Sequence, residues 1–167
     1  VLIRAFTSFI RPLLESSPEV WNTDSVALTN SLEKVQRAFT KRLFHRCGFP
    51  CLEYPDRLNI LGLQSLEFRR AVRDLAFIHS TVSSYYKFDH SKLVEVRPFI
   101  RPTRNGHSLK VTLPFIIKTN HSTVASRTIN VWNKLSQEIV DLPRHVFKQR
   151  LSRMDYETIV PKSLIRR

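Results

Sequence analysis

Residues 32–42 read Leu-Glu-Lys-Val-Gln-Arg-Ala-Phe-Thr-Lys-Arg, and this stretch shows the pattern on which the fold depends. Within and around it, apolar and basic residues each recur every three or four positions. The apolar set is Leu28, Leu32, Val35, Phe39 and Leu43, and the basic set is Lys34, Arg37, Lys41 and His45. A helix advances 100° per residue, so the two sets fall on opposite sides. We expect a helix over residues 25–46, with an apolar stripe facing a core and a cationic stripe facing water or a polyanion.

A second segment repeats this design over residues 66–86, after Ser65, a residue type that favours helix N-caps. Its apolar stripe is Phe68, Val72, Leu75, His79, Val82 and Tyr86. Arg69, Arg70 and Arg73 fall on the opposite side. Arg70 and Asp74 stand one turn apart, which predicts an ion pair worth a few tenths of a kcal/mol.

Shorter helices are expected over residues 1–14, where Pro12 introduces a kink or a new turn, and from Pro55 through Leu61. The 3 glycines stand where the helical periodicity breaks, at Gly48, Gly62 and Gly106. Glycine tolerates the left-handed conformation that ends helices. We therefore interpret these glycines as ends of helices and turns.

The pattern changes from residue 89 to residue 121, where prolines are frequent and basic residues such as Arg101, Arg104 and Lys110 are interspersed. Leu109, Val111 and Leu113 alternate with polar residues, which predicts a short strand, and residues 115–117 are a candidate partner. This part is expected to be an extended basic linker or to contain a short β-hairpin.

Helical spacing returns over residues 124–140. The expected buried face is Ile129, Trp132, Leu135 and Ile139. A last short helix is expected around Phe147 and Leu151. The prediction is a mainly α fold: a helical region over residues 1–88, the linker 89–121, a C-terminal helical pair over 122–155 and a frayed basic tail over 156–167.

Composition points to a polyanionic partner. Lys and Arg number 27 against 14 Asp and Glu, which gives a formal net charge of +13. Nucleic acid is the usual partner of such a chain, and an anionic membrane surface is the alternative. No apolar run approaches the roughly 18 residues of a spanning helix, so no membrane segment is expected.

The chain opens with Val1 and shows no signal-peptide pattern, so we expect it to be a piece of a longer protein. Two cysteines are too few for a disulfide scaffold and fit a reducing compartment. The expected location is intracellular, in the nucleus or the cytoplasm.

Catalytic and metal-binding patterns are weak. His45, Cys47 and Cys51 lie close together, but zinc prefers four ligands from properly spaced pairs, so a helix end that happens to carry two thiols is favoured. His79 lies on an apolar stripe and is interpreted as a hydrogen-bonded core residue. Trp21 and Trp132 have apolar neighbours at helical spacing, which favours burial over stacking on bases.

Several short strings stand in one order along the chain: 9–15 (FIRPLLE), 20–22 (VWN), 32–42, 54–58 (YPDRL), 61–70 (LGLQSLEFRR), 74–75, 127–135 (RTINVWNKL) and 147–151 (FKQRL). Together they resemble the region downstream of the polymerase palm in non-LTR (LINE-type) retrotransposon reverse transcriptases. The chain departs from that pattern at residues 16–19, where an aromatic-Ser-Pro sequence is usual. It departs again at Ser136, where a proline is usual.

The resemblance implies a helical thumb-like bundle and the segment after it, which grip a template–primer duplex while a palm performs the chemistry. Its partners would be RNA template, RNA–DNA hybrid or DNA, and the palm and fingers of the parent polymerase. Such a palm holds Mg²⁺ on paired aspartates. The aspartates here are Asp24, Asp56, Asp74, Asp89, Asp141 and Asp155, and no two are adjacent. The chain alone is therefore expected to be no enzyme and to carry no cofactor.

We take the basic side chains of both helices and of the linker as candidate nucleic-acid-binding residues. They are Lys34, Arg37, Lys41, Arg42, His45, Arg69, Arg70, Arg73, Arg101, Arg104 and Lys110. No catalytic residue or metal ligand is assigned. Two alternatives remain open: that the basic faces are only solvated, and that the chain is a structural or protein-interaction remnant of a transposon polyprotein.

Overall fold

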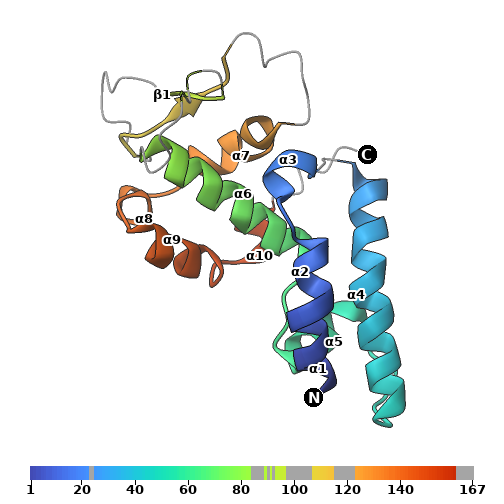
Figure 1. The fold of residues 1–167 in the computed structure, drawn as a ribbon. Helices are drawn as coiled ribbons and strands as arrows, with labels where there is room; N and C mark the ends of the chain where they lie inside the picture. The colour runs from blue at the N-terminus through green and yellow to red at the C-terminus, as the bar shows by residue number, and fades with distance from the viewer. Residues whose placement is uncertain are drawn as a thin grey trace.

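Helix α6 (Leu66–Val82) runs through the middle of the molecule and supplies the largest share of its apolar core (Figure 1). The Ser65 hydroxyl accepts a hydrogen bond from the Phe68 N–H at 3.2 Å and so caps the helix, as predicted. The stripe from Phe68 to Val82 is buried. The helix ends at Val82, and Tyr86 lies outside the described residues, which are 1–22, 25–83, 89, 91, 93–96, 107–114 and 123–160 of this computed structural model.

The fold is mainly α, as the sequence predicted. The N-terminal elements are α1 (Leu2–Ala5), the π-helical turn η1 (Phe6–Ile10), α2 (Arg11–Leu14), α3 (Pro18–Trp21), α4 (Val26–Arg46) and α5 (Tyr54–Leu61). After α6 come β1 (Glu95–Val96), β2 (Val111–Thr112), α7 (Val124–Trp132), α8 (Gln137–Val140), α9 (Arg144–Leu151) and α10 (Tyr156–Ile159). None of the helices in the described parts combines the length and the apolar sequence that crossing a membrane requires.

The helix ends follow the glycines. Gly48 has φ +68° and Gly62 has φ +61°, both in the left-handed region. After Gly62 the Leu63 N–H returns to the Leu58 carbonyl at 2.9 Å, which satisfies a carbonyl at the end of α5. The expected roles of these two glycines are confirmed, and Gly106 lies outside the described residues. At the N-terminus the π-helical turn comes directly before the turn that carries Pro12, where a kink or a new turn was expected.

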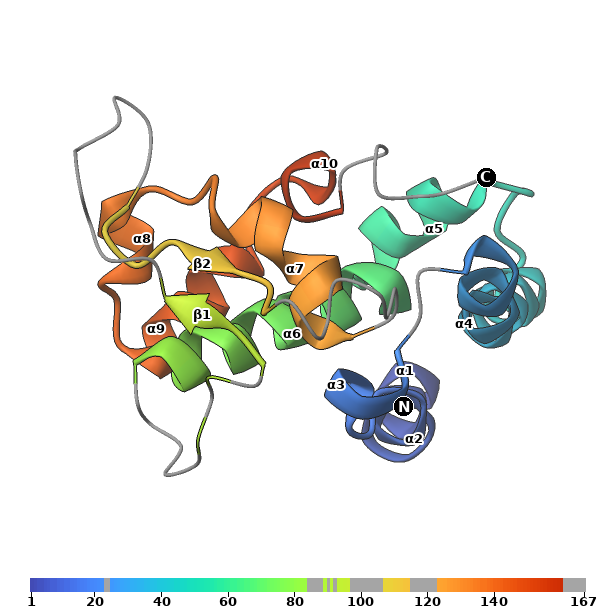
Figure 2. The same ribbon diagram turned by 90° about the horizontal axis from the view of Figure 1, so that it is seen from above.

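The two halves of the molecule differ in how they pack. Seen from above, α1 to α3 and α4 lie side by side at one end, and α6 to α10 form the other (Figure 2). At the first end, the Phe6 ring stacks on Phe39 with centroids 4.2 Å apart. At the other end, the core cluster extends from Phe68 to Val160 in sequence. The boundaries that we expect between domains stay predictions.

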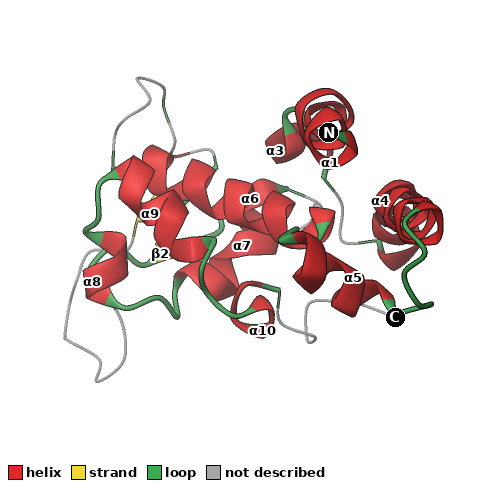
Figure 3. Ribbon diagram, turned by 90° about the horizontal axis from the view of Figure 1, so that it is seen from below, coloured by secondary structure: helices red, strands yellow, loops and turns green. Residues whose placement is uncertain are grey.

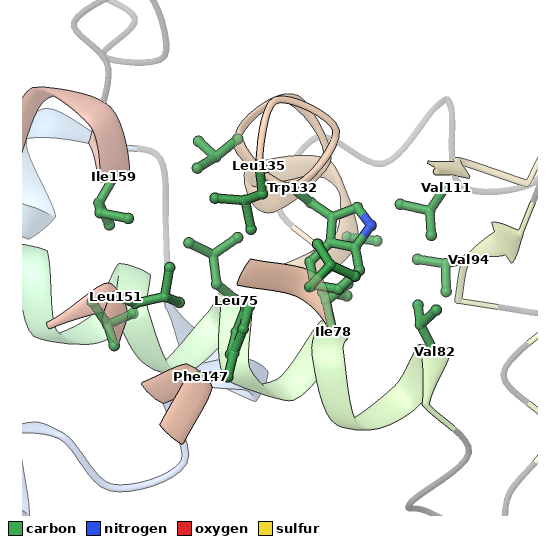
Figure 4. Packing of buried hydrophobic residues seen from close by; sticks show 14 of the residues in the cluster. Leu75, Ile78, Val82, Val94, Val111, Trp132, Leu135, Phe147, Leu151 and Ile159 are labelled. Carbon is green, nitrogen blue, oxygen red and sulfur yellow. The ribbon is translucent and has the colours of Figure 1, made fainter. Parts of the chain in front are cut away.

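Trp132 lies at the centre of this core, 0% exposed, as predicted (Figure 4). Its indole N–H donates to the Leu109 carbonyl at 2.8 Å, and its own carbonyl lies 2.8 Å from the His107 Nε2 atom. Side chains from α6, α7, α9, α10, strand β2 and the residue just before β1 belong to the same core cluster. They include Leu75, Ile78, Val82, Val94, Val111, Leu135, Phe147, Leu151 and Ile159.

Three details of the C-terminal half differ from the predictions. Residues 124–140 form two helices: α7 ends at Trp132, and α8 begins after Ser136, whose backbone is extended. Asn133, just after α7, makes two hydrogen bonds of 3.0 and 2.9 Å with the Val111 backbone. Strand β2 pairs antiparallel with β1 upstream, and the candidate partner 115–117 lies outside the described residues. Residues 156–160 are no frayed tail, because Ile159 and Val160 are buried in the core.

Burial lowers the pKa of two histidines from the ordinary value of 6.5. The His79 Nε2 atom lies 3.0 Å from the Val140 carbonyl, and the ring stacks on Phe147 with centroids 4.1 Å apart. His79 is therefore a hydrogen-bonded core residue, as interpreted from the sequence. His107 lies against Trp132, 1% exposed. In both, the neutral ring fits the apolar surroundings and the charged ring does not.

The fold is therefore expected to lose stability in mild acid. The folded pKa of each histidine lies below the unfolded pKa, so the unfolded chain binds protons first as the pH falls below about 6.5. Each histidine then lowers the free energy of unfolding by up to about 1.4 kcal/mol per pH unit, until the folded pKa is reached. Urea denaturation at pH 7.5 and 5.5 measures this loss. His79→Gln and His107→Gln should each reduce it, whereas His145→Gln, on an exposed side chain, should not.

Candidate nucleic-acid interface

Helix α4 presents three faces, and the buried one is mostly polar. Its buried residues are Glu33, Gln36, Thr40 and Phe44. The apolar stripe was expected to face a core, and this prediction is wrong for much of its length: Leu28 is 57% exposed and Val35 is 40% exposed. The reason is that α5 and the start of α6 offer hydrogen-bonding groups to the polar face, whereas the N-terminal helices cover only part of the apolar stripe.

Glu33 joins α4 to the beginning of α6. Its carboxylate, in a side chain 4% exposed, accepts the N–H groups of Leu66 and Glu67, each at 3.2 Å. The first N–H groups of a helix have no partner within the helix, and its N-terminus favours negative charge. The Tyr54 hydroxyl also donates to Glu33. One carboxylate therefore fixes α4, α5 and α6 together.

Two further polar side chains of α4 complete this contact. The Gln36 amide nitrogen donates to the Gln64 carbonyl at 2.9 Å and to the Tyr54 hydroxyl oxygen at 3.0 Å. The Thr40 hydroxyl oxygen accepts a hydrogen bond from the Arg57 Nε atom at 3.3 Å. Burial and the bond to Glu33 raise the pKa of Tyr54, so its hydroxyl stays a donor at neutral pH. Because this face is anchored, Lys34, Lys41 and His45 project away from the contact with α5 and α6, and Arg37 lies at its edge.

The basic face of α4 is exposed along its whole length, as predicted. Its members are Lys34, Arg37, Lys41, Arg42 and His45. Arg37 also packs over the Tyr54 ring, with its guanidinium carbon 5.1 Å from the ring centroid. At 1.5 Å per residue, the face from Lys34 to His45 is about 16 Å long. The structure thus brings together the five candidate residues of this helix.

The candidate arginines of α6 do not form a second exposed face. Arg70 is 1% exposed, and its Nε atom donates to the Asn22 side-chain oxygen at 3.2 Å. Arg69 makes a two-point contact with the Glu15 carboxylate, and Arg73 donates to the Glu15 carbonyl. The prediction of an exposed cationic stripe is wrong here because α6 is central, and α3 and α4 cover the side opposite its apolar stripe.

The predicted pair of Arg70 with Asp74 is also replaced by another. The Asp74 carboxylate, in a side chain 2% exposed, accepts the Arg127 Nε atom at 3.1 Å and the Asn22 amide at 3.0 Å. Arg127 also donates to the Asn22 carbonyl at 2.8 Å. Burial raises the pKa of Asp74, and the Arg127 charge opposes that shift. A buried pair between distant segments therefore stands where the sequence suggested a weak surface pair.

The linker candidates contribute less. Arg101 and Arg104 lie outside the described residues. Lys110 is half-buried just before β2, away from α4. Cys47 and Cys51 are exposed free thiols at the end of α4. Among the described residues no group of three or more histidines, cysteines or carboxylates is placed to hold a metal ion. Trp21, expected to be buried, is 39% exposed.

Sequence reasoning missed the acidic residues that organise the site. Glu15 stands four residues after Arg11, and that spacing would have indicated a local pair, which is present at 3.8 Å. Nothing in the pattern around Glu33 or Arg127 indicated their partners, because those partners come from other segments. Glu33 fell between the two stripes of α4 and belonged to neither.

Replacing Glu33 should separate α4 from α6. In Glu33→Ala the N–H groups of Leu66 and Glu67 lose their acceptor in a buried place, so we expect a loss of about 2–3 kcal/mol in the free energy of unfolding. Urea denaturation followed by circular dichroism measures the loss. Glu138→Ala, which removes an exposed carboxylate near the start of α8, should cost much less. Equal costs for the two variants would contradict the role of Glu33.

Removing one partner of the buried Arg127–Asp74 ion pair should lower the free energy of unfolding by more than Glu33→Ala does. Arg127→Ala leaves the Asp74 carboxylate buried without its cation, and we expect a loss of about 3 kcal/mol or more. The double variant Arg127→Ala/Asp74→Ala should recover part of that loss, because the Asp74 carboxylate is then no longer buried without the Arg127 cation. Arg153→Ala, at an exposed arginine, serves as the control. A double variant no more stable than the single one would argue against this pairing.

Comparison with known proteins identifies no family. No family model matches the chain, and no solved structure matches it. The chain is 28% identical over 85 residues to uncharacterized protein B0403.1 of Caenorhabditis elegans. The aligned region covers 51% of this chain and 43% of the worm protein, so the similarity extends over about half of each protein.

Proposed function

We propose that this chain is a non-catalytic part of a retrotransposon RNA-directed DNA polymerase and that it holds nucleic acid through the basic face of α4. The observation that carries the proposal is the exposure of five basic side chains along a helix whose polar face is anchored to α5 and α6. Anchoring matters because a fixed helix presents its charges in one register, which limits the conformational entropy lost on binding. The candidate arginines of α6 are not part of this face.

The chemistry of this face suits phosphate contacts. Lysine and arginine side chains bind phosphate oxygens without reading sequence, as a protein that moves along any template requires. A nucleic-acid strand of B form carries one phosphate per 3.4 Å of axis, so a face about 16 Å long has room for several contacts. The formal net charge of +13 favours the same partner through long-range attraction.

The polymerase parentage rests on the ordered strings from residue 9 to residue 151. In that setting the chain would act as the thumb and the segment after it, beside a palm that supplies Mg²⁺ and the catalytic aspartates. The RNA template or RNA–DNA hybrid would lie along α4. The proposed location is inside the cell, in the nucleus or the cytoplasm.

One observation favours the alternative of a protein-interaction module. Beside the basic face, the apolar stripe of α4 and the N-terminal helices line a groove of about 430 Å³. Three apolar residues that line this groove remain open to solvent: Leu2 is 48% exposed, Ile10 43% and Val35 40%. Such a surface fits contact with another protein, including the rest of the polymerase.

The salt dependence of binding tests the proposal. The variant Lys34→Gln/Lys41→Gln/Arg42→Gln removes three exposed charges and leaves Arg37 on the Tyr54 ring. If all three contact phosphates, the slope of log affinity against log salt should fall by roughly 2–3 for duplex DNA, and every sequence should be bound more weakly. Fluorescence anisotropy with an RNA–DNA hybrid and a DNA duplex measures both effects.

The control is Lys134→Gln/Arg150→Gln/Arg153→Gln, which removes the same charge from exposed positions outside α4. It should change the slope much less. Circular dichroism should show intact helices in both variants, since none of the six side chains is buried. An equal slope in the two variants would show that the α4 face is only solvated, and the protein-interaction alternative would then lead.

A further inference from the structure

A second group of cations surrounds the buried carboxylate of Glu15, which is 5% exposed at the end of α2. Arg69 holds that carboxylate at two points, one of them at 2.9 Å, and Arg11 lies 3.8 Å from it. Arg73 donates to the Glu15 backbone carbonyl and so brings a third guanidinium to the same place. Two cations therefore share the Glu15 carboxylate, and a third is bound to the backbone carbonyl of the same residue.

Lys148 adds a fourth cation from a distant part of the sequence. It lies on α9, which packs along α6, the helix that carries Arg69 and Arg73 (Figure 3). Lys148 follows the buried Phe147, so its position is set by the core. Burial lowers the pKa of Lys148, and Arg73 and Arg69 lower it further, against a smaller opposing effect of Glu15.

The charges at this place do not balance. Arg11, Arg69, Arg73 and Lys148 stand around Glu15, and the pKa of Arg11 is lowered too, by burial and by Arg69. Structural ion pairs normally bring compensating charges together, whereas a partly buried excess of one sign costs stability. Phosphate is the ligand class that such a group fits, since it accepts charge-assisted hydrogen bonds from arginine and lysine at the same time.

We propose that Lys148, Arg73 and Arg69, gathered around Glu15, bind a phosphate group. The phosphate group belongs either to the backbone of a bound nucleic acid or to a free polyphosphate. The first assignment rests on the proposed function. The site is separate from the α4 face and is built by α6, α9 and the end of α2. Glu15 positions the arginines. Lys148 supplies a positive charge that forms no ion pair with a carboxylate among the described residues.

Lys148→Gln tests this site without endangering the fold, since Lys148 is exposed and takes part in none of the ion pairs between described residues. Removing an uncompensated charge should leave the melting temperature of the ligand-free chain unchanged or higher. Pyrophosphate should raise the melting temperature of the original chain above its value in NaCl of equal ionic strength. The same comparison should show a much smaller rise for Lys148→Gln. Affinity for an RNA–DNA hybrid near 0.1 M salt should fall about five- to tenfold, and the salt slope by about 1.

Lys134→Gln, with the same charge change at an exposed position outside the cluster, should keep the pyrophosphate effect, and Lys148→Arg should restore most of it. If Lys148→Gln loses the pyrophosphate effect on the melting temperature but still binds the hybrid normally, the result would support the site, with a free polyphosphate as its ligand. Equal behaviour of Lys148→Gln and Lys134→Gln with both probes would overturn it. The α4 variant in the same assays separates the two proposals, because normal hybrid binding there would remove the α4 face and leave this site standing.

Discussion

The contact between the Glu33 carboxylate and the first N–H groups of α6 is the constraint on which the arrangement of the two halves depends. α6 is the central element of the core, and its N-terminus would otherwise be buried with unpaired donors. Because Glu33 of α4 supplies the acceptor, α4 is held against the core in a single orientation about its own axis. The direction of its basic face follows from that rotation.

This contact also explains why the apolar stripe of α4 is not buried like the stripe of α6. A polar face with exact hydrogen-bond partners fixes geometry more specifically than an apolar one, because each donor must meet its acceptor. Gln36 and Thr40 are 0% exposed, whereas Leu28 and Val35 remain largely open. The helix therefore carries two outward surfaces, one basic and one apolar, which suit partners of different kinds.

Three of the 14 acidic residues of this basic chain are buried in the part that the structure describes, and each holds separate segments of the interior together. Glu15, Glu33 and Asp74 are each at most 5% exposed and bind backbone N–H groups or arginines from other segments. These three carboxylates thus serve the fold, while the lysines of α4 keep their charge outside. Arg57, Arg70 and the Arg127 side chain are buried too, so the burial of charge leaves the excess of cations on the surface.

The sequence alone determined the long helices α4 and α6, the Ser65 cap, the end of α5 at Gly62 and the core stripe of α6, because helical periodicity, Ser65 and Gly62 act over a few residues of local sequence. It also determined that Lys34, Lys41 and Arg42 lie outward, and that Trp132 and His79 lie in the core. Only the tertiary structure decided that Arg70 is buried, that Asp74 pairs with Arg127, and that the polar face of α4 is the anchored one. Helical spacing says which residues share a face, but what covers that face comes from segments far away in the chain. Arg127 and Asp74 meet only because α6 packs against α7, and Lys148 lies near the arginines of α6 only because α6 also packs against α9.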